Sequence, residues 1–328
     1  MYANSKGLKY LHGIECYLTS TLDEKIRDNY HTILIAKNYD GVKEINSLID
    51  LSTRPDHMYY KPRITFDEFF NISDNVIKIS ACLASPLSKY PSFITEYCTT
   101  KIKEVEDLIA SEEKKIQQYL SDESRINKWI AEVEKTCEAQ ECPLPWENGE
   151  FDSSKDAYIH AVSEEKMVYQ AQKHHYESLL DKSRSVFNKL LQSYDYYEIQ
   201  PHVKSLDQIK YNQMLYEASK QYGKPLIAGT DTHSINQYKA ECRSILQKAK
   251  KIEYSSEDEF DLTYKSYDEL VEMFRQQGAL PLEIVLEAIE NTNRMAAEVE
   301  DFELDTSFKY PVRYENEEQV FIDRIYRM

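Results

Sequence analysis

The chain has 328 residues, of which 41% are hydrophobic and 30% charged, and its formal net charge is -17 at pH 7. A chain of this length can bury one large core or two modest ones. No apolar stretch is long enough to span a bilayer and no export leader is present, so we expect a cytoplasmic protein without membrane contact. Binding to the phosphate backbone of DNA relies on clustered Lys and Arg. We therefore expect this acidic chain to contact DNA only indirectly, through a partner, a metal ion or a local site.

The first part of the chain, residues 1–99, alternates short apolar runs with one helix-like stretch, which indicates an α/β body. Apolar residues recur at helical spacing over 41–51, so a helix is predicted there. Strands are predicted at 10–15, 31–37 and 76–82.

A helical insertion is predicted over residues 100–194, where the strand signals vanish and apolar residues keep helical spacing among many Glu and Lys. The segment 142–149 contains Pro143 and Pro145 and cannot continue a helix. Two long helices on either side of this break predict an antiparallel hairpin of coiled-coil type that projects from the body. Its outward apolar residues Tyr119, Trp129 and Tyr176 are candidate contacts for a partner protein.

The α/β body is expected to resume over 195–312. Gly223 is expected to cap one helix and Pro281 to open another. The predicted strands are 196–200 and 225–233, and the predicted helices are 206–222, 267–277 and 282–299.

Five side chains of the metal-ligand type lie at ends of the apolar runs, namely Glu15, His31, Cys82, Asp231 and His233. Parallel α/β folds gather strand ends at one edge of the sheet, so we expect these residues to form one cluster. Their oxygen, nitrogen and sulfur donors suit a divalent metal such as Zn, Mn or Fe. The alternative for any single member is an ordinary packed residue, since a lone His or Cys on a strand is usually part of the core.

Several strings in the chain resemble the PHP (polymerase and histidinol phosphatase) domain of bacterial DNA polymerase III alpha subunits. The Tyr-Lys-Pro-Arg string at 60–63 and the Ser-Ala-Cys-Leu-Ala string at 80–84 are typical of the polymerase branch of this superfamily. With the insertion set aside, the resemblance covers most of residues 7–312. The matching strings are 30–38, 59–64, 79–84, 198–202, 225–233 and 288–292.

The resemblance implies a distorted (βα)7 barrel that holds up to three metal ions and supports phosphoester hydrolysis such as 3′→5′ exonuclease activity. It makes Glu15 a bridging carboxylate and His31 and Cys82 ligands of the same ion. Asp231 and His233 match the final metal-binding motif, and the resemblance makes Asp231 and His202 the candidate catalytic residues.

The chain also departs from the family pattern, because the His-x-His and Thr-Asp-His motifs that open the PHP domain do not occur in it. We therefore expect an incomplete barrel, whose unpaired strand edges favour pairing with another chain. Residues 308–312 resemble the family's crossing toward the polymerase core, and 313–328 the start of the link to it. Without that core, the chain is expected to be unable to polymerise DNA, as in a split or truncated replicase of a bacterium or phage.

The sequence leaves three functions open. The first is the PHP component of a replicase, active as a phosphoesterase or exonuclease only when an N-terminal PHP fragment supplies the missing motifs in trans. The second is a non-catalytic scaffold that binds other replicase polypeptides, including a polymerase-core chain. The third, a free-standing phosphoesterase for small phosphate esters, is disfavoured by the polymerase-type strings.

Overall fold

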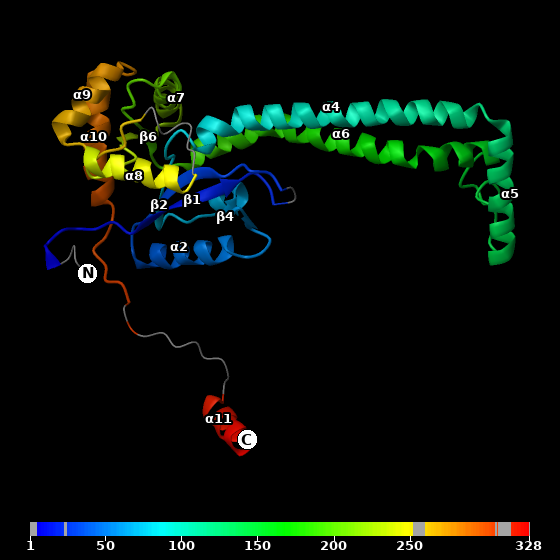
Figure 1. Cartoon of the computed structure of the whole chain (residues 1–328), viewed down its shortest axis with the longest axis horizontal. Coiled ribbons are helices and arrows are strands. Elements are labelled where there is room, and N and C mark those ends of the chain that lie inside the picture. Colours follow the sequence, from blue (N-terminus) through cyan, green and yellow to red (C-terminus); the bar gives the residue numbers. More distant parts are fainter. Residues whose placement is uncertain (1–4, 23–24, 252–259, 306, 308–315, 328) are drawn as a thin grey trace.

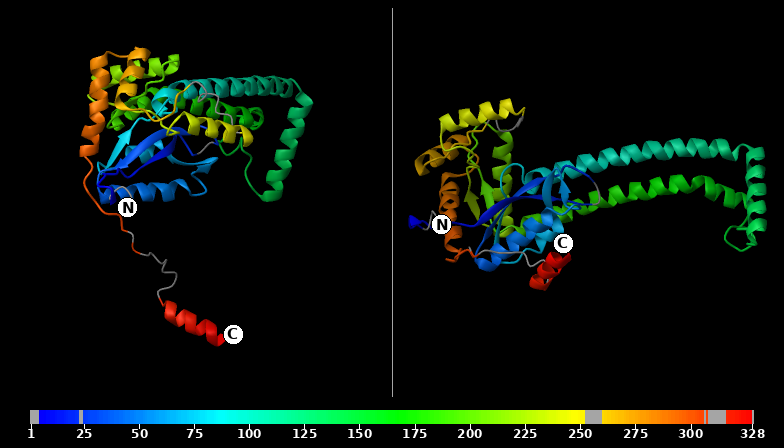
Figure 2. Two further views of the ribbon diagram at one scale, coloured as in Figure 1. Left: turned by 60° about the vertical axis from the view of Figure 1, so that its left-hand side comes forward. Right: turned by 60° about the horizontal axis from the view of Figure 1, so that its bottom comes forward.

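The computed structural model describes residues 5–22, 25–251, 260–305, 307 and 316–327. It shows an α/β body from which a long helical arm projects, with a C-terminal helix set apart from the body (Figures 1 and 2). The predicted crossing at 308–312 lies outside the described residues. No helix of the described part is both long enough and apolar enough to cross a membrane.

The body is built on a mixed sheet in the order β3-β4-β1-β2-β5. Its strands are β1 (Gly13–Thr19), β2 (Tyr30–Ala36), β3 (Met58–Tyr59), β4 (Lys61–Thr65) and β5 (Val76–Ile79). A parallel pair, β6 (Tyr197–Ile199) and β7 (Leu226–Ala228), continues from β5 through a single parallel bridge between Ile79 and Tyr196. The mixed α/β class is confirmed, but the described strands form no closed barrel, and a (βα)7 barrel is not confirmed.

Strand direction and strand ends differ from the prediction in two places. β2 is antiparallel to both of its neighbours, whereas parallel strands were expected. Glu15 was expected to end a strand but lies within β1, which continues to Thr19. The apolar run stops at Glu15, yet the strand continues, because a charged residue on the open face of a half-buried strand does not interrupt the pairing of its backbone.

The helices of the body agree closely with the sequence. α7 ends at Gly223, which has the left-handed φ of +67° that favours glycine, and α10 begins directly after Pro281. α3 was not predicted, and α8 lies in the segment after His233 that was expected to be mostly helical. The helices outside the arm are α2 (Tyr39–Ser52), α3 (Phe66–Phe70), α7 (Leu206–Tyr222), α8 (Gln237–Ala249), α9 (Tyr267–Gln277), α10 (Leu282–Ala297) and α11 (Glu317–Arg327).

The arm contains three helices, α4 (Pro86–Leu120), α5 (Glu123–Gln140) and α6 (Ser154–Ser193), where two were predicted. α4 and α6 run side by side in opposite directions, and α5 turns across the far end (Figures 1 and 2). The missed break follows Leu120, where the Asp122 side chain accepts a hydrogen bond from the Arg125 N–H and caps α5.

The root of the arm lies inside the body, so the predicted boundary at residues 99 and 100 falls within α4. Leu87, Tyr90, Ile94 and Cys98 on the first turns of α4 are buried in the main core, and Leu190 returns to the same core from α6. These residues keep helical spacing, but Pro91 lies inside the helix and is a signal for a break, so the sequence suggested a later start.

Contacts within the arm involve the aromatic residues that were candidate partner contacts. Trp129 packs edge-on against Tyr158, with 5.3 Å between ring centroids, and Tyr176 packs against Tyr97 at 6.1 Å. Tyr119 lies under the Arg125 guanidinium at 3.8 Å. These rings therefore stabilise the arm itself, which corrects the expectation that they point outward.

A set of hydrogen bonds joins β5 to the chain returning from the arm. The Asp195 N–H donates to the Lys78 carbonyl at 2.8 Å, and the Lys78 N–H donates to the Asp195 carboxylate at 2.8 Å. The Ser80 N–H donates to the Tyr196 carbonyl, and the Glu198 N–H donates to the Ser80 hydroxyl. We call this set the β5–β6 seam.

We predict that Asp195→Ala lowers the free energy of unfolding by about 1–3 kcal/mol, because it leaves the Lys78 N–H in the seam without its carboxylate acceptor. Chemical denaturation measures the change. Asp181→Ala on exposed α6 is the matched control, and equal stability of the two variants would contradict the role of the seam.

Candidate functional site

The pairing of β1 with β2 brings the first candidate ligands together. Tyr17 is opposite His31 and Glu15 opposite Ile33, so Glu15 and His31 are diagonal neighbours on one face of the sheet. The Glu15 Oε1 atom lies 2.7 Å from His31 Nδ1. Because β2 runs against its neighbours, His31 near its start lies at the same edge as the carboxyl ends of β1 and β5.

Cys82 reaches this pair from the turn after β5. Ala81 has a left-handed φ of +58°, and the His31 N–H donates to the Ala84 carbonyl, which ties the turn to β2. The Cys82 Sγ atom lies 3.7 Å from His31 Nδ1. Burial is the main cause that raises the pKa of Cys82 to about 12, so the residue is a neutral thiol at neutral pH in the absence of a cation.

Asp231 and His233 belong to the loop after β7, and their charges act on the same cluster. The negative charge of Asp231 adds to the burial that raises the pKa of Cys82. The pKa of Glu15 is lowered, chiefly by its hydrogen bond with His31, and the charge of His233 contributes in the same direction. The five predicted ligands therefore share one electrostatic environment, although their roles as ligands stay a prediction.

Glu198 is a buried carboxylate of this environment that the sequence analysis did not single out. It lies on β6, is 6% exposed, and packs so closely on Gly229 that a Cβ there would stand 2.0 Å from its Oε1 atom. Burial raises the pKa of Glu198 to about 7, the Gln200 hydrogen bond opposes this, and the charges of Asp231 and Glu15 add to it. A glutamate inside a buried strand was the available signal, since such residues are rarely buried without a specific partner.

His202 is connected to Glu198 through one amide side chain. The Gln200 Nε2 group donates to Glu198 Oε1 at 2.7 Å, and His202 Nε2 lies 3.0 Å from Gln200 Oε1. The His202 ring is 3% exposed and stacks on Phe260, with 4.2 Å between the ring centroids. Burial lowers the pKa of His202 to about 4, so the imidazole is neutral at physiological pH.

The donor set fits a metal ion in chemical type but not in its present geometry. A carboxylate, an imidazole and a thiol suit a borderline divalent ion, and the Glu15 carboxylate and the Cys82 thiol both approach His31 Nδ1. Within the described ranges, however, no group of three or more His, Cys, Asp or Glu side chains has the geometry to hold an ion. The donors fit in chemical type, but the Glu15–His31 pair must open and Cys82 must lose its proton before they can coordinate together.

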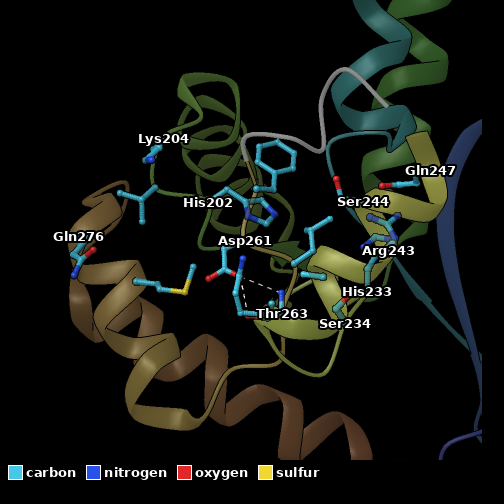
Figure 3. Close-up of a pocket in the computed structure, with 16 residues that line it drawn as sticks. His202, Lys204, His233, Ser234, Arg243, Ser244, Gln247, Asp261, Thr263 and Gln276 are labelled. Atoms are coloured by element: carbon cyan, nitrogen blue, oxygen red, sulfur yellow. Dashed lines mark hydrogen bonds between the residues drawn. The ribbon is translucent and has the colours of Figure 1, made fainter. Parts of the chain in front are cut away.

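A cavity of about 620 Å³ adjoins this cluster and is lined by both His202 and His233 (Figure 3). The segment after β6, the loop after β7, α8 and the segment before α9 form its walls. The candidate catalytic residue His202 thus lines a cavity at the edge of the cluster, and its side chain is hydrogen-bonded to Gln200.

We predict that the stability of the chain falls by ~2 kcal/mol as pH rises from about 5 to about 8 because of Glu198. The folded chain keeps the Glu198 proton up to about pH 7, whereas the unfolded chain releases it near the ordinary value of 4.5. Stability is therefore present at low pH and lost as pH rises through this window. Glu198→Gln should remove most of this fall, as measured by urea unfolding in a chelator, and an unchanged pH profile would contradict the assignment.

Comparisons with known proteins agree with the resemblance seen in the sequence. Residues 1–124 match the family model of the PHP domain, and this part includes Glu15, His31 and Cys82. The chain is also similar to DNA polymerase III alpha subunits, which confirms the predicted resemblance to the PHP domain of these proteins.

The similarity to these polymerase subunits covers a small part of each. The identity is 32% over 99 residues for Aquifex aeolicus, which is 27% of this chain and 8% of the relative. It is 36% over 87 residues for Borreliella burgdorferi, with 25% and 8% covered. For Chlamydia pneumoniae it is 25% over 240 residues, with 70% and 14% covered. The matched region therefore spans 14% or less of the length of these three relatives.

Proposed function

We propose that the chain is the PHP component of a DNA polymerase III alpha-like replicase, with phosphoesterase or 3′→5′ exonuclease chemistry when the missing motifs are supplied in trans. The observation that carries the proposal is the convergence of Glu15, His31 and Cys82 at one sheet edge, within the segment that matches the PHP family. The relatives named DNA polymerase III subunit alpha support the link to replication.

In this proposal Glu15, His31 and Cys82 hold one divalent ion, and Asp231 and His233 contribute to a neighbouring ion. A bound ion of this kind supplies Lewis acidity toward a phosphoryl oxygen and lowers the pKa of bound water. Asp231 orients the reacting groups. His202 is the second candidate catalytic residue. It lines the cavity, and Gln200 fixes its ring by a hydrogen bond.

We predict that cobalt(II) bound to the purified chain gives a thiolate-to-cobalt absorption band that Cys82→Ser abolishes. Thiolate sulfur is a strong ligand for such ions, and Cys82 is the cysteine next to His31. Cys242→Ser, which changes an exposed cysteine on α8, is the matched control and should keep the band. Absence of the band, or its survival in Cys82→Ser, would contradict the ligand assignment.

The catalytic part of the proposal is tested with single-stranded DNA. The chain alone should degrade it weakly or not at all, because a multi-ion mechanism needs ligands from the missing motifs. Mixing with a polypeptide that carries the His-x-His and Thr-Asp-His motifs should restore activity, and Asp231→Asn should abolish it again. Robust manganese-dependent degradation by the chain alone, lost in Asp231→Asn, would show that the isolated chain is already competent.

A non-catalytic scaffold is the second candidate function, and the projecting arm is the observation that favours it (Figure 1). Ion pairs between Lys166 and Glu113 and between Lys173 and Glu106 link α4 to α6 along the arm. An arm of this length is stabilised by its own contacts and presents a long surface to other replicase polypeptides.

We predict that deleting residues 107–172, with a short Gly-Ser joint, leaves the body folded and removes binding of a polymerase-core polypeptide. The cut ends face each other, since Glu106 and Lys173 form an ion pair of 2.6 Å across the two helices. Circular dichroism and co-purification measure the two results. Lys173→Gln in the chain without the deletion is the control for loss of the ion pair alone. If binding of the polymerase-core polypeptide is undiminished after the deletion, the arm is a passive insertion.

A further inference from the structure

The turn that ends α5 brings two cysteines together at the far end of the arm (Figure 1). Glu141 follows the helix with a left-handed φ of +53°. The Cys142 N–H donates to the Cys137 carbonyl at 3.0 Å, and the Glu141 N–H donates to the Glu138 carbonyl at 3.3 Å. These bonds define a Schellman motif, in which the side chain after the left-handed residue commonly contacts the last turn of the helix. Both positions of that contact are cysteine here.

The two thiols face each other and can be reached from solvent. A hydrogen bond with the Cys142 thiol is the main cause that raises the pKa of Cys137. Cys142 is exposed, and Cys137 is half-buried. A disulfide needs Cα atoms roughly 4.4–6.8 Å apart and side chains that point toward each other. The backbone hydrogen bond holds the two Cα atoms close, and the thiol hydrogen bond brings the side chains together, so the pair can join without moving the helix.

The loop after Cys142 is packed against the arm, so this turn decides where the loop leaves α5. The Trp146 ring lies 6.4 Å from that of Trp129 on α5. The Phe151 N–H donates to the Pro145 carbonyl at 3.1 Å and closes the loop before α6. A covalent bond between the two cysteines would therefore fix the base of the surface that the tip of the arm presents.

We propose that Cys137 and Cys142 form a reversible disulfide, a modification site whose co-reactant is a small disulfide such as oxidised glutathione. The exposed Cys142 gives its proton to water, and its thiolate attacks one sulfur of the small disulfide, so that one glutathione thiolate departs and the other stays bound to Cys142. The deprotonated Cys137 then attacks the Cys142 sulfur and expels the second glutathione. The two cysteines lose two electrons and two protons, and the two glutathione thiols receive them.

The short spacing of the two cysteines makes this bond reversible. It closes a loop with four residues between the cysteines, and closure of so short a loop adds little stability, so an excess of reduced glutathione reopens it. The proposal involves neither the site cluster nor the replicase role, and it can fail or hold independently of the proposed function.

The test equilibrates the full-length chain under nitrogen, in a chelator, at rising ratios of oxidised to reduced glutathione. Alkylation by iodoacetamide and mass spectrometry then show which thiols are free. Cys137 and Cys142 should become protected together, in one peptide that is two hydrogens lighter. Cys137→Ser should stop at a glutathione adduct on Cys142. Cys242→Ser, which changes an exposed cysteine on α8, is the matched control and should oxidise as the unaltered chain does.

Two outcomes would overturn the proposal. One is alkylation of both Cys137 and Cys142 at the highest ratio of oxidised glutathione. The other is a lasting glutathione adduct on Cys142 in the unaltered chain, because Cys137 would then fail to complete the exchange.

The role of the turn is tested at Glu141, whose left-handed backbone the motif requires. Glu141→Val places a β-branched residue at a positive φ, so it should raise the glutathione ratio at the midpoint of oxidation about fivefold. Glu141→Gly removes the same carboxylate but suits the left-handed φ, so it is the matched control and should not raise the midpoint. Equal midpoints in the two variants would overturn the argument that the turn holds the pair together.

Discussion

The β5–β6 seam is the constraint on which the rest of the structure depends. It joins Lys78 to Asp195, two residues 117 positions apart, and so closes the body across the whole inserted arm. Closing so long a segment costs conformational entropy, which the backbone and carboxylate hydrogen bonds and the buried root of the arm must offset. The same seam sets the position of β6, because the Ser80 hydroxyl accepts from the Glu198 N–H. Glu198 on β6 is therefore placed beside the site cluster by contacts that lie at the base of the arm.

The reversed direction of β2 is the second determinant of the site. In a sheet whose neighbouring strands run the other way, the start of β2 meets their carboxyl ends, and His31 reaches both Glu15 and Cys82. Without this reversal, His31 would lie at the opposite edge. The arrangement gathers an acid, an imidazole and a thiol, with the buried Glu198 nearby, at one edge of an acidic protein. Burial and the negative charges of nearby carboxylates raise the pKa values of Glu198 and Cys82. Both groups therefore keep a proton, which a bound cation would displace.

The relation between sequence and structure differs from one element to another. The bounds of α7 agree with the prediction because Gly223 supplies a local stop signal. The start of α10 agrees because Pro281 supplies a local start, but α10 ends at Ala297 and not at residue 299. The start of α4 was predicted too late, because Pro86 and Pro91 are signals for a break, although the buried residues of its first turns keep helical spacing. The break before α5 coincides with the Asp122 cap, a local signal that the sequence contains.

The sequence by itself determined the α/β class, the inserted helical segment, the ends of the helices with local caps and the candidate ligands by type. These properties follow from periodicity and from Gly, Pro and motif residues, which act within a few positions along the chain. Only the tertiary structure decided the direction of β2, the open sheet, the seam and the connection from Glu198 through Gln200 to His202. The physical reason is that strand pairing and the burial of a carboxylate are set by residues far apart in sequence, whose contacts no local pattern records.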